Sequence, residues 1–226
     1  MSNRLPDILS SRDLPLAELS SLCLDGEVFR LGDLWSPVDV AEGRDQRARS
    51  VSLLVPVRAI AERLTAAWIY GLAPEPVRHQ FCVPITARAY FPPSLRFGVR
   101  EVVCTPENTV RVGARRQLRR PDAFGAPHSA TRARSLNQDN PDDRRGDGLL
   151  VTRPLRTALD IARWPPPELP DPAPLIAALL RLAGHPDASV ARRACAIDGL
   201  PYTHRALVQL DAADNAMMAL APISRR

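Results

Sequence analysis

The sequence predicts an α+β fold with a small N-terminal unit, a central mixed α/β sheet domain and a set of C-terminal helices. Three observations lead to this prediction. Residues 149–164 join an apolar run to a helical pattern, residues 14–38 join a helical pattern to two short strand-like runs, and residues 175–220 repeat leucine and alanine at helical spacing. We divide the chain into an N-terminal unit at 1–45 and a larger domain at 50–226.

The segment LLVTRPLRTALDIARW carries most of the fold prediction. Its apolar run at 149–151 predicts a buried strand. Thr152 is expected to be the N-cap of a helix, because Pro154 fits the first helical position. Leu155 and Leu159 lie one helical turn apart and form an apolar face together with nearby alanines. We therefore predict a docking helix directly after the strand.

Length and composition indicate a globular protein. The 226 residues are 45% hydrophobic, which is enough to bury a substantial core. The sequence has no apolar run of membrane-span length, and its start, MSNRLPDILSS, lacks the pattern of a signal peptide. We expect a cytoplasmic protein with no membrane partner. Four widely spaced cysteines are expected to be reduced and buried: Cys23, Cys82, Cys104 and Cys195.

The basic residues narrow the possible functions. The net charge is +5, and all 30 cationic residues are arginine. Without lysine, the chain cannot form a GxxxxGK[ST] phosphate loop, a lysine Schiff base, an SxxK acyl-transfer site or a two-acid-plus-lysine nuclease centre. The arginine bias, together with abundant alanine and proline, is typical of a GC-rich genome. The net positive charge is still compatible with nucleic acid as a partner.

The N-terminal unit is predicted to contain one helix and one hairpin. Leucines at helical spacing predict a helix over 14–24, with Asp13 placed to cap it. Two short runs at 27–31 and 34–38 flank a Gly-Asp pair, which predicts a tight hairpin turn. The polar stretch at 39–50 is interpreted as a linker or a short surface helix.

The central domain is predicted to contain a sheet with helices packed against it. A strand is expected after Val51, followed by a largely buried helix over 59–72. Three further strands are expected in the runs at 80–86, 95–104 and 109–112.

The rest of the chain alternates irregular and helical segments. Residues 113–148 mix arginine and aspartate with few aliphatic residues, so we expect a mobile insertion that is either a phosphate-neutralising arm or a solvated loop. The proline-dense segment 164–174 is expected to be a stiff spacer. C-terminal helices are expected at 175–183, 188–197 and 202–220.

No catalytic motif is found. The sequence has no GxSxG or HExxH motif, and its histidines have no partner at metal-ligand spacing. We expect a protein that is not an enzyme and has no cofactor or metal. An enzyme acting on a small anionic substrate remains a third hypothesis, which only the arginine-rich loops favour.

Arg156 and Asp160 are four residues apart on the predicted docking helix and are expected to form an ion pair. A solubilising pair at the surface is one interpretation. In another, Arg156 is buried and ties the helix to the sheet or to a carboxylate such as Glu101. Arg153 and Arg156 near the helix start are also candidates for contact with an anionic partner.

Four segments together resemble actinobacterial members of the AbiEi antitoxin family of type IV toxin–antitoxin systems: LDGEVFRLGDLWSPVD (24–39), RLTAAWIYGL (63–72), VREVVCTPENTVRVG (99–113) and LLVTRPLRTALDIARW (149–164). The resemblance implies an N-terminal winged helix, here degenerate because few helices precede the hairpin. It also implies an α/β antitoxin domain and the absence of catalytic activity.

The resemblance further implies two partners: the double-stranded DNA of the protein's own promoter, and a nucleotidyltransferase-type toxin that the protein neutralises. The candidate DNA-binding residues are Arg12, Ser20, Ser21 and Arg30, and the candidate partner-binding residues are Arg153 and Arg156. The alternative hypothesis is a protein-interaction module that does not bind DNA.

Overall fold

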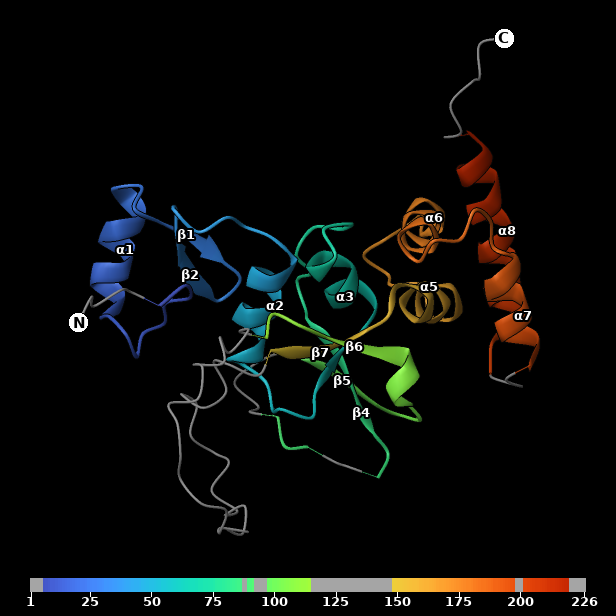
Figure 1. Ribbon diagram of the computed structural model, residues 1–226, viewed down its shortest axis with the longest axis horizontal. Coiled ribbons are helices and arrows are strands. Elements are labelled where there is room, and N and C mark those ends of the chain that lie inside the picture. The colour runs from blue at the N-terminus through green and yellow to red at the C-terminus, as the bar shows by residue number, and fades with distance from the viewer. Residues whose placement is uncertain (1–5, 87–88, 92–96, 115–147, 198–200, 220–226) are drawn as a thin grey trace, which may run out of the picture.

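Five short strands form a mixed sheet near the middle of the protein, and helices lie above and beside it (Figure 1). The computed structural model describes residues 6–86, 89–91, 97–114, 148–197 and 201–219. These residues form helices, the five-stranded sheet and a separate two-stranded sheet. The predicted α+β class is therefore confirmed.

The N-terminal unit contains the expected helix and hairpin. Helix α1 (Leu16–Leu24) is followed by strands β1 (Val28–Leu31) and β2 (Leu34–Pro37), which pair antiparallel. Leu9 adds an isolated bridge to Trp35 on the open side of the hairpin. Among the described residues before the hairpin, α1 is the single helix. The degenerate winged helix therefore stays a prediction.

The start of α1 differs from the prediction. Pro15 occupies the N-cap, and no side chain caps the helix. The Asp13 carboxylate instead accepts hydrogen bonds from the backbone N–H and the hydroxyl of Ser10, at 2.9 and 2.8 Å. Asp13 therefore stabilises the turn before the helix, and the predicted cap is wrong because this turn uses the carboxylate first.

Helix α2 (Arg44–Ser52) corrects the interpretation of residues 39–50 as a linker. The helix is present, but one side of it is buried, with Val51 only 2% exposed. The buried Gln46 amide donates a hydrogen bond to the Ser36 hydroxyl at 2.8 Å. The strand expected after Val51 does not form there, because Val51 belongs to α2. This helix joins the hairpin and the sheet within one hydrophobic cluster.

The predicted helix over 59–72 is shorter than expected. Ile60 and Ala61 form β3, the middle strand of the sheet, and helix α3 (Arg63–Ile69) starts just after it. Arg63 has a φ of +45°, which turns the chain sharply from strand to helix. The helical spacing of residues 59–62 was misleading because hydrogen bonds to strands on both sides of β3 override local preference.

The remaining strands agree with the sequence prediction. They are β4 (Gln80–Pro84), β5 (Gly98–Val102), β6 (Thr109–Val112) and β7 (Leu149–Thr152). The order in the sheet is β5-β4-β3-β7-β6, with β4 parallel to β5 and β3 parallel to β7. The chain from β5 to β6 therefore passes from one edge of the sheet to the other, and it contains the 3₁₀ turn η1 (Pro106–Asn108).

Helix α5 (Pro154–Arg163) begins at the expected proline. Its N-cap is Arg153, however, and not Thr152. Thr152 remains in β7, where its hydroxyl shares a hydrogen bond of 2.7 Å with the Thr157 hydroxyl. The predicted cap is wrong by one residue because the strand continues up to the residue before the turn.

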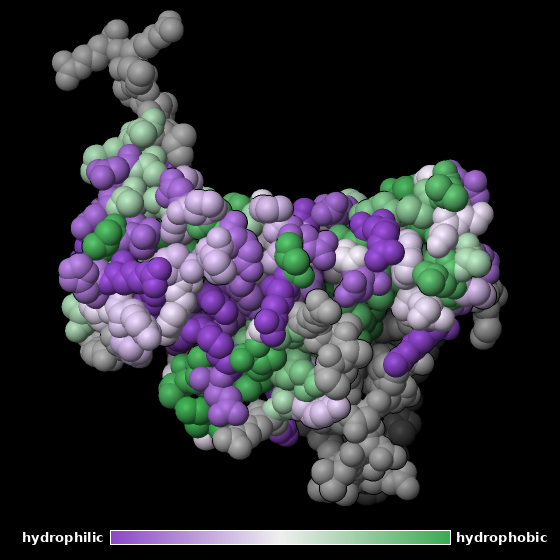
Figure 2. Space-filling view, turned by 180° about the vertical axis from the view of Figure 1, so that it is seen from behind, coloured by the Kyte–Doolittle hydropathy of each residue, from purple (hydrophilic) through white to green (hydrophobic). Residues whose placement is uncertain are grey.

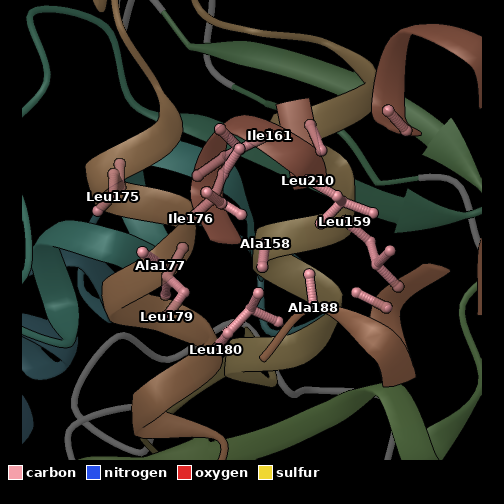
Figure 3. Packing of buried hydrophobic residues seen from close by; sticks show 14 of the residues in the cluster. Ala158, Leu159, Ile161, Leu175, Ile176, Ala177, Leu179, Leu180, Ala188 and Leu210 are labelled. Atoms are coloured by element: carbon pink, nitrogen blue, oxygen red, sulfur yellow. The ribbon is translucent and has the colours of Figure 1, made fainter. Parts of the chain in front are cut away.

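The C-terminal helices occur where the sequence predicts them. They are α6 (Ala173–Leu182), α7 (Ser189–Ile197) and α8 (Thr203–Ala219). Figure 3 shows their apolar side chains packed against those of α5, including Ala158, Ile161, Ile176 and Leu180. Helix α5 is therefore the docking helix that the sequence predicts, and its apolar face meets other helices.

Two further predictions concern segments outside helices and strands. Residues 164–172 form neither, but the predicted spacer over 164–174 ends earlier than expected, because α6 begins at Ala173. The predicted insertion at 113–148 lies, apart from its ends, outside the described residues. In the part of the chain that the structure covers, none of the helices is both long and apolar enough to span a bilayer.

Candidate functional site

A group of charged side chains lies where α3 and α5 meet the five-stranded sheet. Its two carboxylates are almost fully enclosed, since Glu62 is 0% and Asp160 is 1% exposed. Three arginines interact with them: Arg63, Arg100 and Arg156. We call these five residues the charge cluster. Buried charges cost free energy unless they are paired, so this concentration of charge requires an explanation.

Glu62 is the centre of the charge cluster. It follows β3, so the end of that strand fixes its backbone. Arg100, on β5, binds both carboxylate oxygens with hydrogen bonds of 2.7 and 2.6 Å. Arg63 forms an ion pair with the same carboxylate, with 3.3 Å between Arg63 Nε and Glu62 Oε1. A two-pronged arginine–carboxylate contact is among the strongest hydrogen-bonded pairs in proteins.

The guanidinium of Arg100 is held from a second side. It lies over the ring of Trp164, 4.4 Å from the ring centroid, at the C-terminal end of α5. Burial is the largest single effect and disfavours its charge, but the hydrogen bonds to Glu62 and the negative charges of Glu62 and Asp160 together outweigh burial and raise the pKa of Arg100. Arg100 therefore links the sheet to the end of α5.

The predicted ion pair between Arg156 and Asp160 is present, with 2.9 Å between Nε and Oδ2. It is not the surface pair of the first interpretation, because the side chains of Arg156 and Asp160 are only 15% and 1% exposed. The pair turns inward since the same helix face packs on α3. Both groups therefore lose hydration, which opposes the attraction between their charges.

Burial raises the pKa of Asp160, and Arg156 only partly offsets this effect. A folded-state pKa above the unfolded value means that the folded protein holds this proton more tightly. The contribution of Asp160 to stability is therefore greatest below its unfolded pKa and falls as the pH rises through its folded pKa.

We expect this loss to disappear in Asp160→Asn, which cannot ionise. The difference in unfolding free energy between Asp160→Asn and wild type should shift in favour of the variant from acid to neutral pH. Urea unfolding across that range measures it. Glu168→Gln, at an exposed position, is the control and should follow wild type at every pH. If the difference in unfolding free energy between Asp160→Asn and wild type did not change with pH, the raised pKa of Asp160 would be wrong.

The charge cluster presents positive charge to solvent. Both carboxylates are enclosed, whereas the side chains of Arg63, Arg100 and Arg156 are 16%, 24% and 15% exposed. Arg63 also keeps a backbone conformation that is costly for a residue with a side chain. The arrangement holds α5 to the sheet and places a small cationic surface beside it. Among the described residues, no group of three or more potential metal-binding side chains was found.

The candidate residues from the sequence fall on two separate parts of the protein. Arg12, Ser20, Ser21 and Arg30 are exposed on the N-terminal unit, at one end of the molecule (Figure 1). Arg153 and Arg156 lie together at the start of α5. The exposed Arg153 donates from Nε to the carbonyl oxygen of Thr109 on β6, at 3.1 Å.

Three of the candidate DNA-binding residues are engaged within the N-terminal unit. The Ser20 hydroxyl donates to the backbone carbonyl of Leu16 at 2.8 Å, and the Ser21 hydroxyl donates to the Asp25 carboxylate at 3.4 Å. The Arg30 guanidinium lies over Trp35, 4.8 Å from the ring centroid, and these residues face each other across the hairpin. These contacts do not test DNA binding, so the four residues remain predictions.

Sequence reasoning missed Glu62 and Arg100. Glu62 fell inside the predicted helix over 59–72 and was not singled out, and Arg100 lies in a strand whose neighbours give no sign of a buried partner. Their contact joins residues 38 positions apart, and no local pattern encodes it.

No protein-family model matches the sequence, and no curated protein matches it. The functional argument therefore depends on the residues and their geometry.

Proposed function

We propose that the protein is an antitoxin-type interaction module that binds a partner protein, and that its N-terminal unit does not read DNA. The distribution of charge carries this proposal. Residues 1–45 contain nine acidic residues and four arginines, a formal charge of −5, whereas residues 46–226 contain 16 acidic residues and 26 arginines, a formal charge of +10. The unit that would read DNA is thus the acidic part of the chain.

An acidic unit opposes DNA binding for a general reason. Proteins gain most of their affinity for DNA by neutralising phosphates with arginine or lysine. On the exposed side of α1, Glu18 and Asp25 would instead repel phosphates. The serines between them offer short hydroxyls, and that of Ser20 already bonds to the helix backbone. The N-terminal unit therefore lacks both the general attraction and good candidates for base contacts.

The same helix has features that suit a protein contact. Leu16 and Leu24 lie two turns apart on α1 and are 58% and 89% exposed. Figure 2 shows hydrophobic and hydrophilic side chains side by side over the N-terminal unit. Exposed leucines among acidic residues fit a partner that presents an apolar centre with a basic rim. A basic partner protein is therefore the occupant we propose for α1.

Fluorescence anisotropy on DNA tests the proposal first. The full chain is titrated onto its own upstream duplex and a scrambled duplex, at low and near-physiological salt. We expect equal affinity for both duplexes, lost at the higher salt, and no effect of the double change Arg12→Ala/Arg30→Ala. The matched double change Arg193→Ala/Arg205→Ala removes exposed arginines from the basic part and should weaken the residual binding.

A preference for the upstream duplex that persists at near-physiological salt and is lost in Arg12→Ala/Arg30→Ala would overturn the proposal. Growth rescue tests the proposed binding of a partner protein: the chain is co-expressed with a nucleotidyltransferase-type toxin. We expect rescue by wild type and by the Arg12→Ala/Arg30→Ala variant, and its loss in Leu16→Glu/Leu24→Glu. Rescue that survives this leucine change would remove α1 from the partner surface.

Promoter binding is the second candidate function, and one observation favours it. The formal charge of +10 on residues 46–226 is sufficient for electrostatic contact with phosphates. In that case upstream preference would depend on Arg193 and Arg205 and not on Arg12 and Arg30. The same anisotropy series therefore separates the two candidates.

A further inference from the structure

Arg163, the last residue of α5, is a buried cation with donors left over. It is 1% exposed. Its Nε and Nη2 atoms are shielded from solvent, and neither has a hydrogen-bond partner among the residues that the structure describes. Arginine keeps its proton in proteins, so the charge of an enclosed guanidinium has to be offset by a counter-charge.

The two atoms form one edge of the guanidinium, on which their N–H bonds point the same way. Arg100 uses this edge in the same protein: its Nε and Nη2 donate to the two carboxylate oxygens of Glu62 at 2.7 and 2.6 Å. Arg163 therefore offers the kind of fork that Arg100 directs at a carboxylate, a shape suited to an anion with two adjacent oxygens.

The charges near Arg163 favour an anion over water. Arg163 follows Asp160 and Arg156 by three and seven residues, so it lies on the same face of α5. Together with the charge cluster, it makes four arginines against two carboxylates, a formal charge of +2. In the described part of the chain, the enclosed Oδ1 of Asp160 also has no hydrogen-bond partner. Water could satisfy such donors and acceptors but would not offset the charge.

We propose that the Nε–Nη2 edge of Arg163 binds a small oxyanion, with inorganic phosphate as the best match in charge. Two oxygens of phosphate, of sulfate or of a short carboxylate fit the fork. Because the edge is enclosed, the ligand is a free ion and not a phosphate group on a larger molecule. It enters by local opening of the adjoining segment 164–172, which is neither helix nor strand. This site goes beyond the proposed function and does not depend on it.

Equilibrium dialysis of the full chain against radiolabelled inorganic phosphate tests the proposal. Near-physiological sodium chloride in the buffer screens phosphate from surface arginines. We expect saturable binding of one phosphate per chain. Sulfate should displace it because it offers the same pair of oxygens, whereas adenosine monophosphate should not, because its nucleoside cannot enter. Displacement by adenosine monophosphate as strong as by sulfate would place the phosphate on the surface and contradict the proposal.

Variants separate the fork from the charge. Arg163→Met removes both and should abolish the binding. Arg163→Lys keeps the charge but not the paired N–H groups, so the binding should weaken by about tenfold or more. Arg193→Met makes the same change as Arg163→Met at an exposed position on α7, and it should bind phosphate like wild type.

Thermal unfolding gives a second readout. Each tenfold increase in phosphate above its dissociation constant should raise the Tm of wild type and Arg193→Met by about 4 °C. Arg163→Met should show only the general effect of phosphate on protein stability. It should fold without phosphate, because an apolar side chain replaces a buried charge. If it does not fold, the wild-type dialysis decides alone. Absence of saturable binding by wild type, or equal binding by a folded Arg163→Met, would overturn the proposal.

Discussion

Replacing Glu62 by glutamine should lower the free energy of unfolding by about 3 kcal/mol. Glutamine has nearly the same shape, but it lacks the charge and turns an N–H group toward one of the two arginine donors. Arg100 and Arg63 would then be held without their common counter-charge. Removing one partner of a buried ion pair typically costs about 3–5 kcal/mol. We expect the lower end because Arg100 is 24% exposed and can regain some hydration.

Urea unfolding followed by circular dichroism measures this effect. Glu168→Gln is the control, because it makes the same change of side chain at an exposed position outside the charge cluster. The control should change the unfolding free energy by about 0.5 kcal/mol or less. If Glu62→Gln were as mild as the control, Glu62 would not hold the charge cluster together.

A second large effect is expected from Leu180→Ala in the helical core. Leu180 is 0% exposed, and Figure 3 shows it among the side chains of the cluster formed by α5 and α6. The change removes buried methyl groups and leaves a cavity that the surrounding helices fill only in part. Such substitutions cost about 2–5 kcal/mol, and we expect the unfolding free energy to fall by this amount.

Leu182→Ala on the same helix provides the control. Leu182 is 50% exposed, so its replacement by alanine removes less buried apolar surface than Leu180→Ala. Alanine also preserves the helix propensity of this position. Its unfolding free energy should stay within about 1 kcal/mol of wild type. Equal losses for Leu180→Ala and Leu182→Ala would show that the core is not packed as Figure 3 shows.

Two arginines at the start of α5 differ in their surroundings. Arg153 and Arg156 were selected from the sequence as partner-binding residues. Arg156 is in fact engaged with Asp160. Its first role is therefore inside the protein, whereas the exposed Arg153 remains accessible to a partner.

The sequence by itself determined the α+β class, the N-terminal helix and hairpin, the strand before α5, and the C-terminal helices. These elements are marked by local signals: apolar residues at regular spacing, a glycine in a tight turn, and a proline at a helix start. Such signals act between residues a few positions apart, so they can be recognised without knowledge of the fold.

Only the tertiary structure decided the position of the sheet's middle strand and the composition of the charge cluster. The strand β3 is two residues long, and hydrogen bonds from neighbours on both sides define it. The pairing of Glu62 with Arg100 depends on which strands lie side by side. Such contacts join residues far apart in the chain, and burial then gives them their strength, because enclosed charges interact without competing water.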